Sequence, residues 1–420
     1  MAGSTLSDYA EIVMGQSPPG ETCNMAGEGL PLLNGPTEYG SHHPAPVQFT
    51  TDARKRAKPG DVLFCVRGST TGRMNWADRE YAIGRGVAAI RHKSRGDLQP
   101  FVRAVIEYGL PGLLAQATGS TFPNVSADQL AGIWWPPLNV DEQRAIAHIL
   151  GTLDDKIELN RRMSETLEAM ARALFKSWFV DFDPVRAKAE GRDPGLPQPL
   201  ADLFPARLVD SELGEIPEGW EVAPLPDVME VNPTRRLRRG EVAPYLDMAN
   251  MPTRGHAPDA VIDRAFGSGM RFMNGDTLVA RITPCLENGK TAYVDFLQDG
   301  QVGWGSTEYI VLHPKPPVPS EFAYCLARSS EFRDFAIQSM TGSSGRQRVP
   351  AESLAHFRVV AAPKTIAERF GRLIKPLFSR ASAATTESRT LAALRDTLLP
   401  KLISGELRVK DAERFIEASS

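Results

Sequence analysis

The sequence of this chain repeats itself. Gly60-Asp61-Val62-Leu63 recurs as Gly275-Asp276-Thr277-Leu278, and Thr118-Gly119-Ser120 recurs as Thr341-Gly342-Ser343. The copies lie 215 residues apart for the first motif and 223 for the second, whereas solenoid units repeat every roughly 20–50 residues. We therefore expect a duplicated domain, and two similar modules indicate a reader of a target that also has two halves.

The two halves continue alike beyond these motifs. A polar loop follows each Thr-Gly-Ser, and a Val-to-Leu segment then begins at Val125 in the first half and at Val349 or Pro350 in the second. Proline-rich chain and a long helical pattern come next. Short apolar runs between turn residues predict buried strands. The expected strands are 62–66, 86–90, 276–282 and 308–312, and residues 101–114 and 320–339 are expected to be helical.

Apolar residues recur at heptad spacing after residue 141. They predict a long helix from about Asp141 to Phe179 with one apolar seam. Asn160 is the polar member of this seam and is expected to weaken its packing but fix its register. The two prolines at 136–137 exclude helix just before it. The seam positions are Ile146, Leu150, Leu153, Ile157, Asn160, Leu167, Met170 and Leu174.

A second seam begins at Ile366. Pro376 lies within it, and a proline in a helix interior costs about 3 kcal/mol, so a kink or a late start is expected. Neither helix can bury its apolar stripe alone. Antiparallel pairing within the chain is the economical arrangement, and parallel pairing between two copies is the alternative. The further seam positions are Phe370, Leu373, Leu377, Ala381, Ala384, Leu391, Leu394, Leu398 and Leu402.

These patterns predict an α+β fold. Two repeated mixed α/β domains are separated by two long helices that form an antiparallel coiled coil. The expected boundaries are 1–140 for the first domain, 141–182 for the first long helix, 183–215 for a Pro-, Gly- and Ala-rich linker, 216–363 for the second domain, 364–404 for the second long helix and 405–420 for a tail.

The distribution of charge is more informative than the net charge of −3. Residues 53–103 contain twelve Lys or Arg and four Asp or Glu, and residues 235–239 are a compact basic cluster in the second half. Any single basic run is as often a solvated face as a binding surface. Basic runs in both halves favour contact with a polyanion.

No constellation of catalytic or metal-ligating residues stands out. Gly289-Lys290-Thr291 resembles the end of a P-loop, but Pro284 stands where its first glycine is needed. His42 and His43 are adjacent and have no Cys or His cluster beside them. The four cysteines are far apart, which argues against a disulfide framework or zinc ribbon and for a reducing cytoplasm. No membrane span or signal peptide is visible, so a membrane association is not expected.

The chain resembles the specificity subunits of type I restriction–modification systems. The resemblance is carried by residues 136–182, which run from Pro-Pro-Leu-Asn-Val-Asp-Glu-Gln-Arg to Lys-Ser-Trp-Phe-Val-Asp-Phe, by Ile216-Pro217-Glu218-Gly219-Trp220, and by Leu399-Pro400-Lys401-Leu402-Ile403-Ser404-Gly405. The second long helix departs from the pattern, because it begins Lys-Thr-Ile-Ala-Glu-Arg at residue 364 and lacks an Asp-Glu-Gln start.

This resemblance implies two target recognition domains, each reading one half of a bipartite, asymmetric site in double-stranded DNA. It implies a helical spacer that docks two methyltransferase subunits, with motor–nuclease subunits completing the complex. The chain itself is then not an enzyme and carries no cofactor; S-adenosylmethionine, ATP and magnesium are expected on the partner subunits. A coiled-coil scaffold and a stand-alone DNA-modifying enzyme are the alternatives.

Loops that carry Arg, Lys, Asn, Gln, Ser or Thr are the expected DNA contacts, because these side chains bond phosphates and base edges. In the first half the candidates are Arg67, Ser69, Thr70, Thr71, Arg73, Thr118, Ser120, Thr121 and Asn124. In the second half they are Arg235, Arg236, Arg281, Asn288, Lys290, Thr341, Ser343, Arg346, Gln347 and Arg348, with Arg238 and Arg239 as further phosphate contacts. The candidates for subunit docking are Glu142, Gln143, Ile146, Ile149, Leu153, Glu368 and Phe370.

Overall fold

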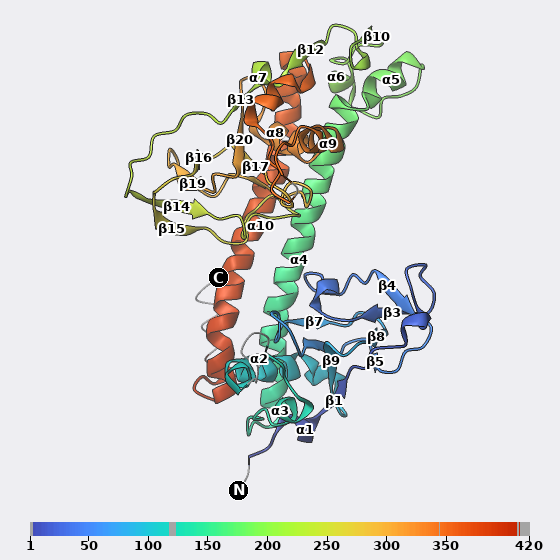
Figure 1. Cartoon of the computed structure of the whole chain (residues 1–420), viewed down its shortest axis with the longest axis vertical. Coiled ribbons are helices and arrows are strands. Elements are labelled where there is room, and N and C mark those ends of the chain that lie inside the picture. Colours follow the sequence, from blue (N-terminus) through green and yellow to red (C-terminus); the bar gives the residue numbers. More distant parts are fainter. Residues whose placement is uncertain (1–2, 117–122, 344, 410, 412–420) are drawn as a thin grey trace. The chain divides into compact units, whose positions relative to one another are not determined.

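The computed structural model describes residues 3–116, 123–343, 345–409 and 411. The chain forms two compact units, one of residues 1–159 with 388–420 and one of residues 160–387. Two long helices, α4 (Val140–Phe179) and α10 (Lys364–Ser404), run through both units (Figure 1). Each unit therefore consists of one globular module together with a part of each long helix.

The first module contains two sheets. One has the order β1-β9-β6-β7 and is antiparallel throughout; the other has the order β2-β4-β3-β8-β5, with β3 and β8 parallel. The strands are β1 (Ala10–Met14), β2 (Cys23–Asn24), β3 (Leu30–Leu33), β4 (Gln48–Thr50), β5 (Arg56–Ala57), β6 (Val62–Cys65), β7 (Met74–Trp76), β8 (Tyr81–Ile83) and β9 (Val87–His92). The helices are α1 (Leu6–Tyr9), α2 (Gln99–Gln116) and α3 (Ala127–Ala131).

The second module repeats this topology. Its sheet β13-β20-β17-β18 matches β1-β9-β6-β7, and its sheet β15-β14-β19-β16 again has one parallel pair, β14 with β19. Two smaller sheets pair β10 with β11 and β12 with β21. The strands are β10 (Leu208–Ser211), β11 (Gly214–Pro217), β12 (Glu221–Pro224), β13 (Met229–Val231), β14 (Val242–Leu246), β15 (Ile262–Ala265), β16 (Met270–Phe272), β17 (Thr277–Ala280), β18 (Thr291–Tyr293), β19 (Gly303–Gly305), β20 (Tyr309–Pro314) and β21 (Arg358–Ala361). The helices are α7 (Leu225–Val228), α8 (Ser320–Ala327) and α9 (Ser330–Gln338).

Equivalent hydrogen bonds align the two modules. The amide of Val125 donates to the carbonyl of Val66 over 2.8 Å, and the amide of Val349 donates to the carbonyl of Arg281 over 2.9 Å. Val349, rather than Pro350, is therefore the counterpart of Val125. The duplicated domain and the four expected strands are confirmed, and the expected helix 320–339 is divided in two, α8 and α9.

The long helices pack antiparallel in each unit. In the second unit Asn160 donates to Glu387 over 2.8 Å, and Ser164 donates to the carbonyl of Ala381 over 3.3 Å. Later residues of α4 therefore contact earlier residues of α10, which is an antiparallel arrangement. In the first unit Arg395 donates to Asp154 over 2.6 Å. The helix α10 begins at Lys364 and continues through Pro376, so the expected late start is wrong.

The predicted seams are also wrong at two points. Met170 and Leu373 are exposed, at 53% and 43%, whereas Ala171 and Ile374 next to them are fully buried. Ala171 and Ile374 belong to the same buried cluster as Phe322 of α8. The buried stripe of each helix is therefore set here by packing against the second module.

The segment 183–215, which was expected to be a linker, is itself folded. It contains α5 (Asp183–Ala189) and α6 (Gln198–Ala201), each with a proline in its first turn. Val185 and Phe204 are buried, and the Phe204 ring packs on Trp178 with centroids 4.9 Å apart. The prolines that suggested a linker instead begin helices, where their missing N–H costs nothing.

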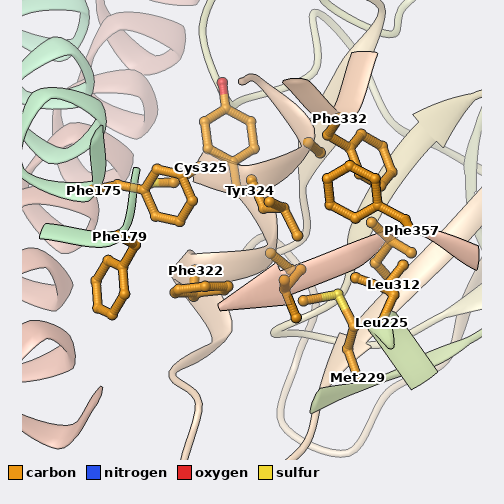
Figure 2. Packing of buried hydrophobic residues seen from close by; sticks show 14 of the residues in the cluster. Phe175, Phe179, Leu225, Met229, Leu312, Phe322, Tyr324, Cys325, Phe332 and Phe357 are labelled. Carbon is orange, nitrogen blue, oxygen red and sulfur yellow. The ribbon is translucent and has the colours of Figure 1, made fainter. Parts of the chain in front are cut away.

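Aromatic side chains join α4 to the second module. Phe175 and Phe179 point from α4 toward Phe322 of α8, with centroid distances of 5.0 and 5.1 Å (Figure 2). Phe370 of α10 lies 4.8 Å from Phe179. Edge-to-face pairs of this kind add to the burial of apolar area, so the second module is held firmly on its own parts of α4 and α10.

Candidate nucleic-acid interface

The repeated Gly-Asp motif anchors the strand that leads to each candidate loop. Asp61 accepts from the amide of Lys58 over 2.7 Å and is paired with Arg91 at 2.7 Å. The glycine before each aspartate, Gly60 or Gly275, has a φ of 85° or 89°, which favours glycine. The motif is therefore a structural turn that precedes β6 and β17.

Asp276 is the counterpart of Asp61. It accepts from the amide of Met273 over 2.8 Å and contacts Arg235 at 3.2 Å and His313 at 2.7 Å. Burial raises the pKa of both aspartates despite these partners. Arg235 is consequently only 16% exposed, so this member of the predicted phosphate-binding cluster has a structural partner, while Arg236 next to it is exposed.

The structure brings the two candidate segments of the first module together. Arg67 and Asn124 form an isolated β-bridge, and the amide of Gly68 donates to the carbonyl of Pro123 over 3.3 Å. The Thr71 hydroxyl donates to the same carbonyl over 2.8 Å. Three further candidates, Thr118, Ser120 and Thr121, lie outside the described residues.

The side chains of this surface fall into two groups. Those of Arg67, Ser69 and Asn124 are exposed and bond to no other described residue, and Thr70 is exposed as well. In contrast, Arg73 donates to the carbonyls of Pro36 and Tyr39 over 3.3 and 3.2 Å. Arg73 thus holds the loop to the segment between β3 and β4, whereas the Arg67 side chain is exposed and bonds to no other described residue.

The corresponding segments of the second module also converge. Ile282 pairs with Arg348, and the amide of Thr283 donates to the carbonyl of Gln347 over 3.0 Å. Glu308 accepts from both Arg281 and Arg348, at 3.3 and 2.9 Å. One carboxylate therefore orients two guanidinium groups, and the cluster retains a net positive charge.

The side chains of the remaining candidates of this module differ in whether they are exposed or bonded to other residues. Asn288, Thr341, Ser343 and Arg346 are exposed, and Gln347 is half-buried. Lys290 instead donates to the carbonyls of Met248 and Ala249. Its ammonium group therefore joins the loop 281–290 to residues 248–249.

Ion pairing reduces the basic character of residues 53–103. Arg91 and Arg103 are paired with Asp61 and Glu107 at 2.7 and 2.8 Å and are mostly buried. Arg54 and Arg56 also contact carboxylates, at 2.7 and 3.1 Å. The excess positive charge of this stretch consequently rests on a smaller set of side chains, of which Arg67 and Arg73 lie in a candidate loop.

Two contributors had no signal in the sequence. Glu308 stands 27 residues from Arg281 and 40 from Arg348, and no local pattern links them. Arg328 ends α8 and bonds carbonyls of two distant loops. Only the folded chain brings these groups together.

Comparisons with known proteins agree with this geometry. Residues 2–169 match the family described as the type I restriction modification DNA specificity domain. The chain is 23% identical over 409 residues to the type I restriction enzyme HindI specificity subunit of Haemophilus influenzae, covering 84% of this chain and 88% of that protein. It is 26% identical over 309 residues to the MjaIX specificity subunit of Methanocaldococcus jannaschii, covering 70% and 65%.

The chain is similar over most of its length to type I restriction–modification specificity subunits, and residues 2–169 match their DNA specificity domain. Its fold is shared with the crystal structure of the S subunit of a type I restriction–modification system from M. genitalium, with a TM-score of 0.54, 16% identity and 95% of both chains covered. The expected α+β architecture with two packed long helices is thereby confirmed.

The predicted docking residues of this chain are mostly internal. Gln143, Ile146, Ile149 and Leu153 are at most 8% exposed and belong to the first unit, and Phe370 is fully buried in the second. Such side chains can hold the helices in place but offer no surface to another subunit.

The other two docking candidates lie at the surface near helix starts. Glu142 is exposed and accepts from the amide of Asn139 over 3.0 Å, which caps α4. Glu368 is half-buried and contacts Lys364 at 3.7 Å. Leu159, Met170 and Leu373 are exposed apolar side chains on the long helices, at 59%, 53% and 43%.

Neither a membrane span nor a metal site is present in the part of the chain that the structure describes. None of its helices is long and apolar enough to cross a membrane, and no three His, Cys, Asp or Glu side chains gather there as metal ligands. His42 and His43 pack edge to face, and His43 Nδ1 lies 3.0 Å from the carbonyl oxygen of Trp76. Burial lowers the pKa of His42.

Proposed function

We propose that this chain reads a bipartite, asymmetric site in double-stranded DNA, one half with each module. The observation that carries the proposal is the duplication of one loop pair at equivalent places in both modules. Each pair presents exposed hydrogen-bonding side chains of the kinds that contact phosphates and base edges. The sequences of the two loop pairs differ, which favours different half-sites.

Within this proposal the long helices dock two methyltransferase subunits, and motor–nuclease subunits complete a cytoplasmic complex. The exposed Leu159, Met170 and Leu373 support docking on the helices, because apolar side chains in water favour burial against a partner. S-adenosylmethionine, ATP and magnesium belong to the partner subunits, and this chain contributes recognition rather than catalysis.

Adenine methylation across a genome tests the proposal. The chain is expressed with a candidate methyltransferase partner, and each protein expressed alone is the control. A new two-part motif that needs both proteins is the expected result. Methylation by this chain alone would instead identify a stand-alone enzyme, and copurification with a methyltransferase that is active on other targets, but without a motif, would identify a scaffold.

A further inference from the structure

Arg328 bonds two loops of the second module at once. Its guanidinium donates to the carbonyls of Thr253 and Gly289 over 2.8 and 2.7 Å, and to those of Gly255 and Thr291 over 2.6 and 3.0 Å. Because the guanidinium is a rigid planar fork, it fixes the positions of its acceptors relative to one another. One side chain therefore joins residues 253–255 to residues 289–291.

The backbone of both loops is shaped to accept these bonds. Gly255 and Gly289 have φ values of 78° and 76°, in the left-handed region that favours glycine. A Cβ atom added at Gly289 would lie 3.6 Å from the Arg328 guanidinium, so the guanidinium lies directly against this turn. The loops and the arginine form one close-fitting unit.

Arg328 is itself held by Tyr324 of α8. Its Nε donates to the Tyr324 hydroxyl over 3.1 Å, and its guanidinium lies 5.4 Å from the centre of the same ring. Tyr324 is fully buried and its pKa is raised by burial and by Glu168, a buried residue of α4. The arginine is thus tied to the rigid interior of the second unit.

One of the two loops carries candidate DNA contacts. Residues 281–290 include Arg281 and the exposed Asn288, which precedes the Arg328-bound Gly289. Lys290 secures the same loop by donating to the carbonyls of Met248 and Ala249. The beginning of the loop, at residues 282–283, pairs with residues 347–348. Arg328 and Lys290 hold the end of the loop, at residues 289–290.

We infer that Arg328 is a positioning residue that sets the base specificity of the second module by fixing loop 281–290. It touches no DNA and acts through the carbonyls of the loop. This inference rests on the proposed function. A reading loop must hold its side chains within a small tolerance of the productive geometry, so loosening the loop reduces discrimination between bases before it reduces overall binding.

Methylation mapping of the full chain with its methyltransferase partner tests the inference. Arg328→Met removes every one of these bonds, and Arg328→Lys keeps the charge but has no fork to span four carbonyls. Both variants are expected to relax one or more positions in one half of the motif roughly tenfold, the effect of losing one good base contact. The other half is expected to stay unchanged. Arg207→Met, at an exposed arginine of the same unit, is the control.

A purely structural role predicts a different result. Methylation would then fall equally at all sites, with both halves of the motif intact, and that outcome overturns the inference. If Arg328→Met fails to fold, Arg328→Lys and Tyr324→Phe decide, and an unchanged motif in both also overturns it. Hydrogen exchange of the full chain adds a readout without DNA, in which amides 288–291 are expected to exchange faster in Arg328→Lys. The unaltered chain must give a two-part motif; if it does not, the proposed function has failed instead.

Discussion

Arg67 and Arg235 are both candidate DNA contacts, but the structure places them in different surroundings. The Arg67 side chain is exposed in a candidate loop and bonds to no other described residue. Arg235 lies beside the buried Asp276 and is 16% exposed. The basic runs in the sequence do not show which arginine is exposed and which is paired, because the carboxylate that binds Arg235 lies 41 residues further along the chain.

The two arginines are expected to respond differently to truncation. Arg67→Ala should leave stability unchanged and weaken DNA binding by the methyltransferase complex. A base contact would cost about 1–3 kcal/mol at one position, and a phosphate contact would lower the salt slope by about 1. Arg235→Ala should lower the free energy of unfolding by about 1–3 kcal/mol, because a buried carboxylate loses a partner. Thermal denaturation and salt-dependent binding measure both; equal destabilisation by the two variants would contradict this assignment.

His256 is expected to make the stability of the second unit depend on pH. It is 2% exposed, and burial lowers its pKa although Asp295 and Glu168 favour the charged form. Arg328 acts in the same direction as burial, and Ser382 of α10 lies 3.3 Å from His256 Nε2. The folded state therefore keeps this imidazole neutral at a pH where the unfolded chain takes up a proton.

Stability is consequently expected to fall as the pH drops below about 6.5, the unperturbed value for histidine. A depressed pKa contributes stability that is present above this value and lost below it, by at most about 1.4 kcal/mol for each pH unit. His256→Gln should flatten the slope measured by thermal denaturation between pH 7 and pH 5. His356→Gln, at an exposed histidine, should not. If both variants keep the original slope, His256 is not responsible.

At the scale of elements, the helices were the most predictable part of the chain. The heptad pattern and the prolines at 136–137 place α4 within a residue or two of its observed bounds. The seam near Met170 and Leu373 was not predictable, because the direction of burial there is set by the second module rather than by the heptad. The folded segment 183–205 was missed because its short helices bury residues such as Phe204 against Trp178, a tertiary contact with no local signal.

Pro376 offers a test at this scale. It is exposed within the continuous helix α10, where it removes a backbone donor and crowds the preceding turn. Pro376→Ala is expected to raise the free energy of unfolding by about 1–3 kcal/mol, part of the cost of a proline in a helix interior. Chemical denaturation measures the change, with the neighbouring exposed Lys375→Ala as control. A destabilised Pro376→Ala variant would show that α10 needs the proline.

At the scale of the whole molecule, duplication is the feature that sequence and structure share. The repeated Gly-Asp and Thr-Gly-Ser motifs predicted two related domains, and the matching sheet orders confirm them. The motifs did not reveal that Gly-Asp is a turn anchor, since the partners Arg91, Arg235 and His313 are distant in sequence. They also did not reveal which loop side chains lack a hydrogen-bond partner, because several of them bond to Glu308 or to backbone carbonyls that are distant in sequence.

The central claim is that each module reads its own half of one DNA site. Methylation mapping with Arg67→Ala and Arg346→Ala, each in the full chain with the methyltransferase partner, tests it most directly. The two side chains are exposed in the candidate loops of different modules. Arg67→Ala is expected to change one half of the methylated motif and Arg346→Ala the other half. Changes by both variants in the same half, or uniform loss across the motif, would contradict the claim.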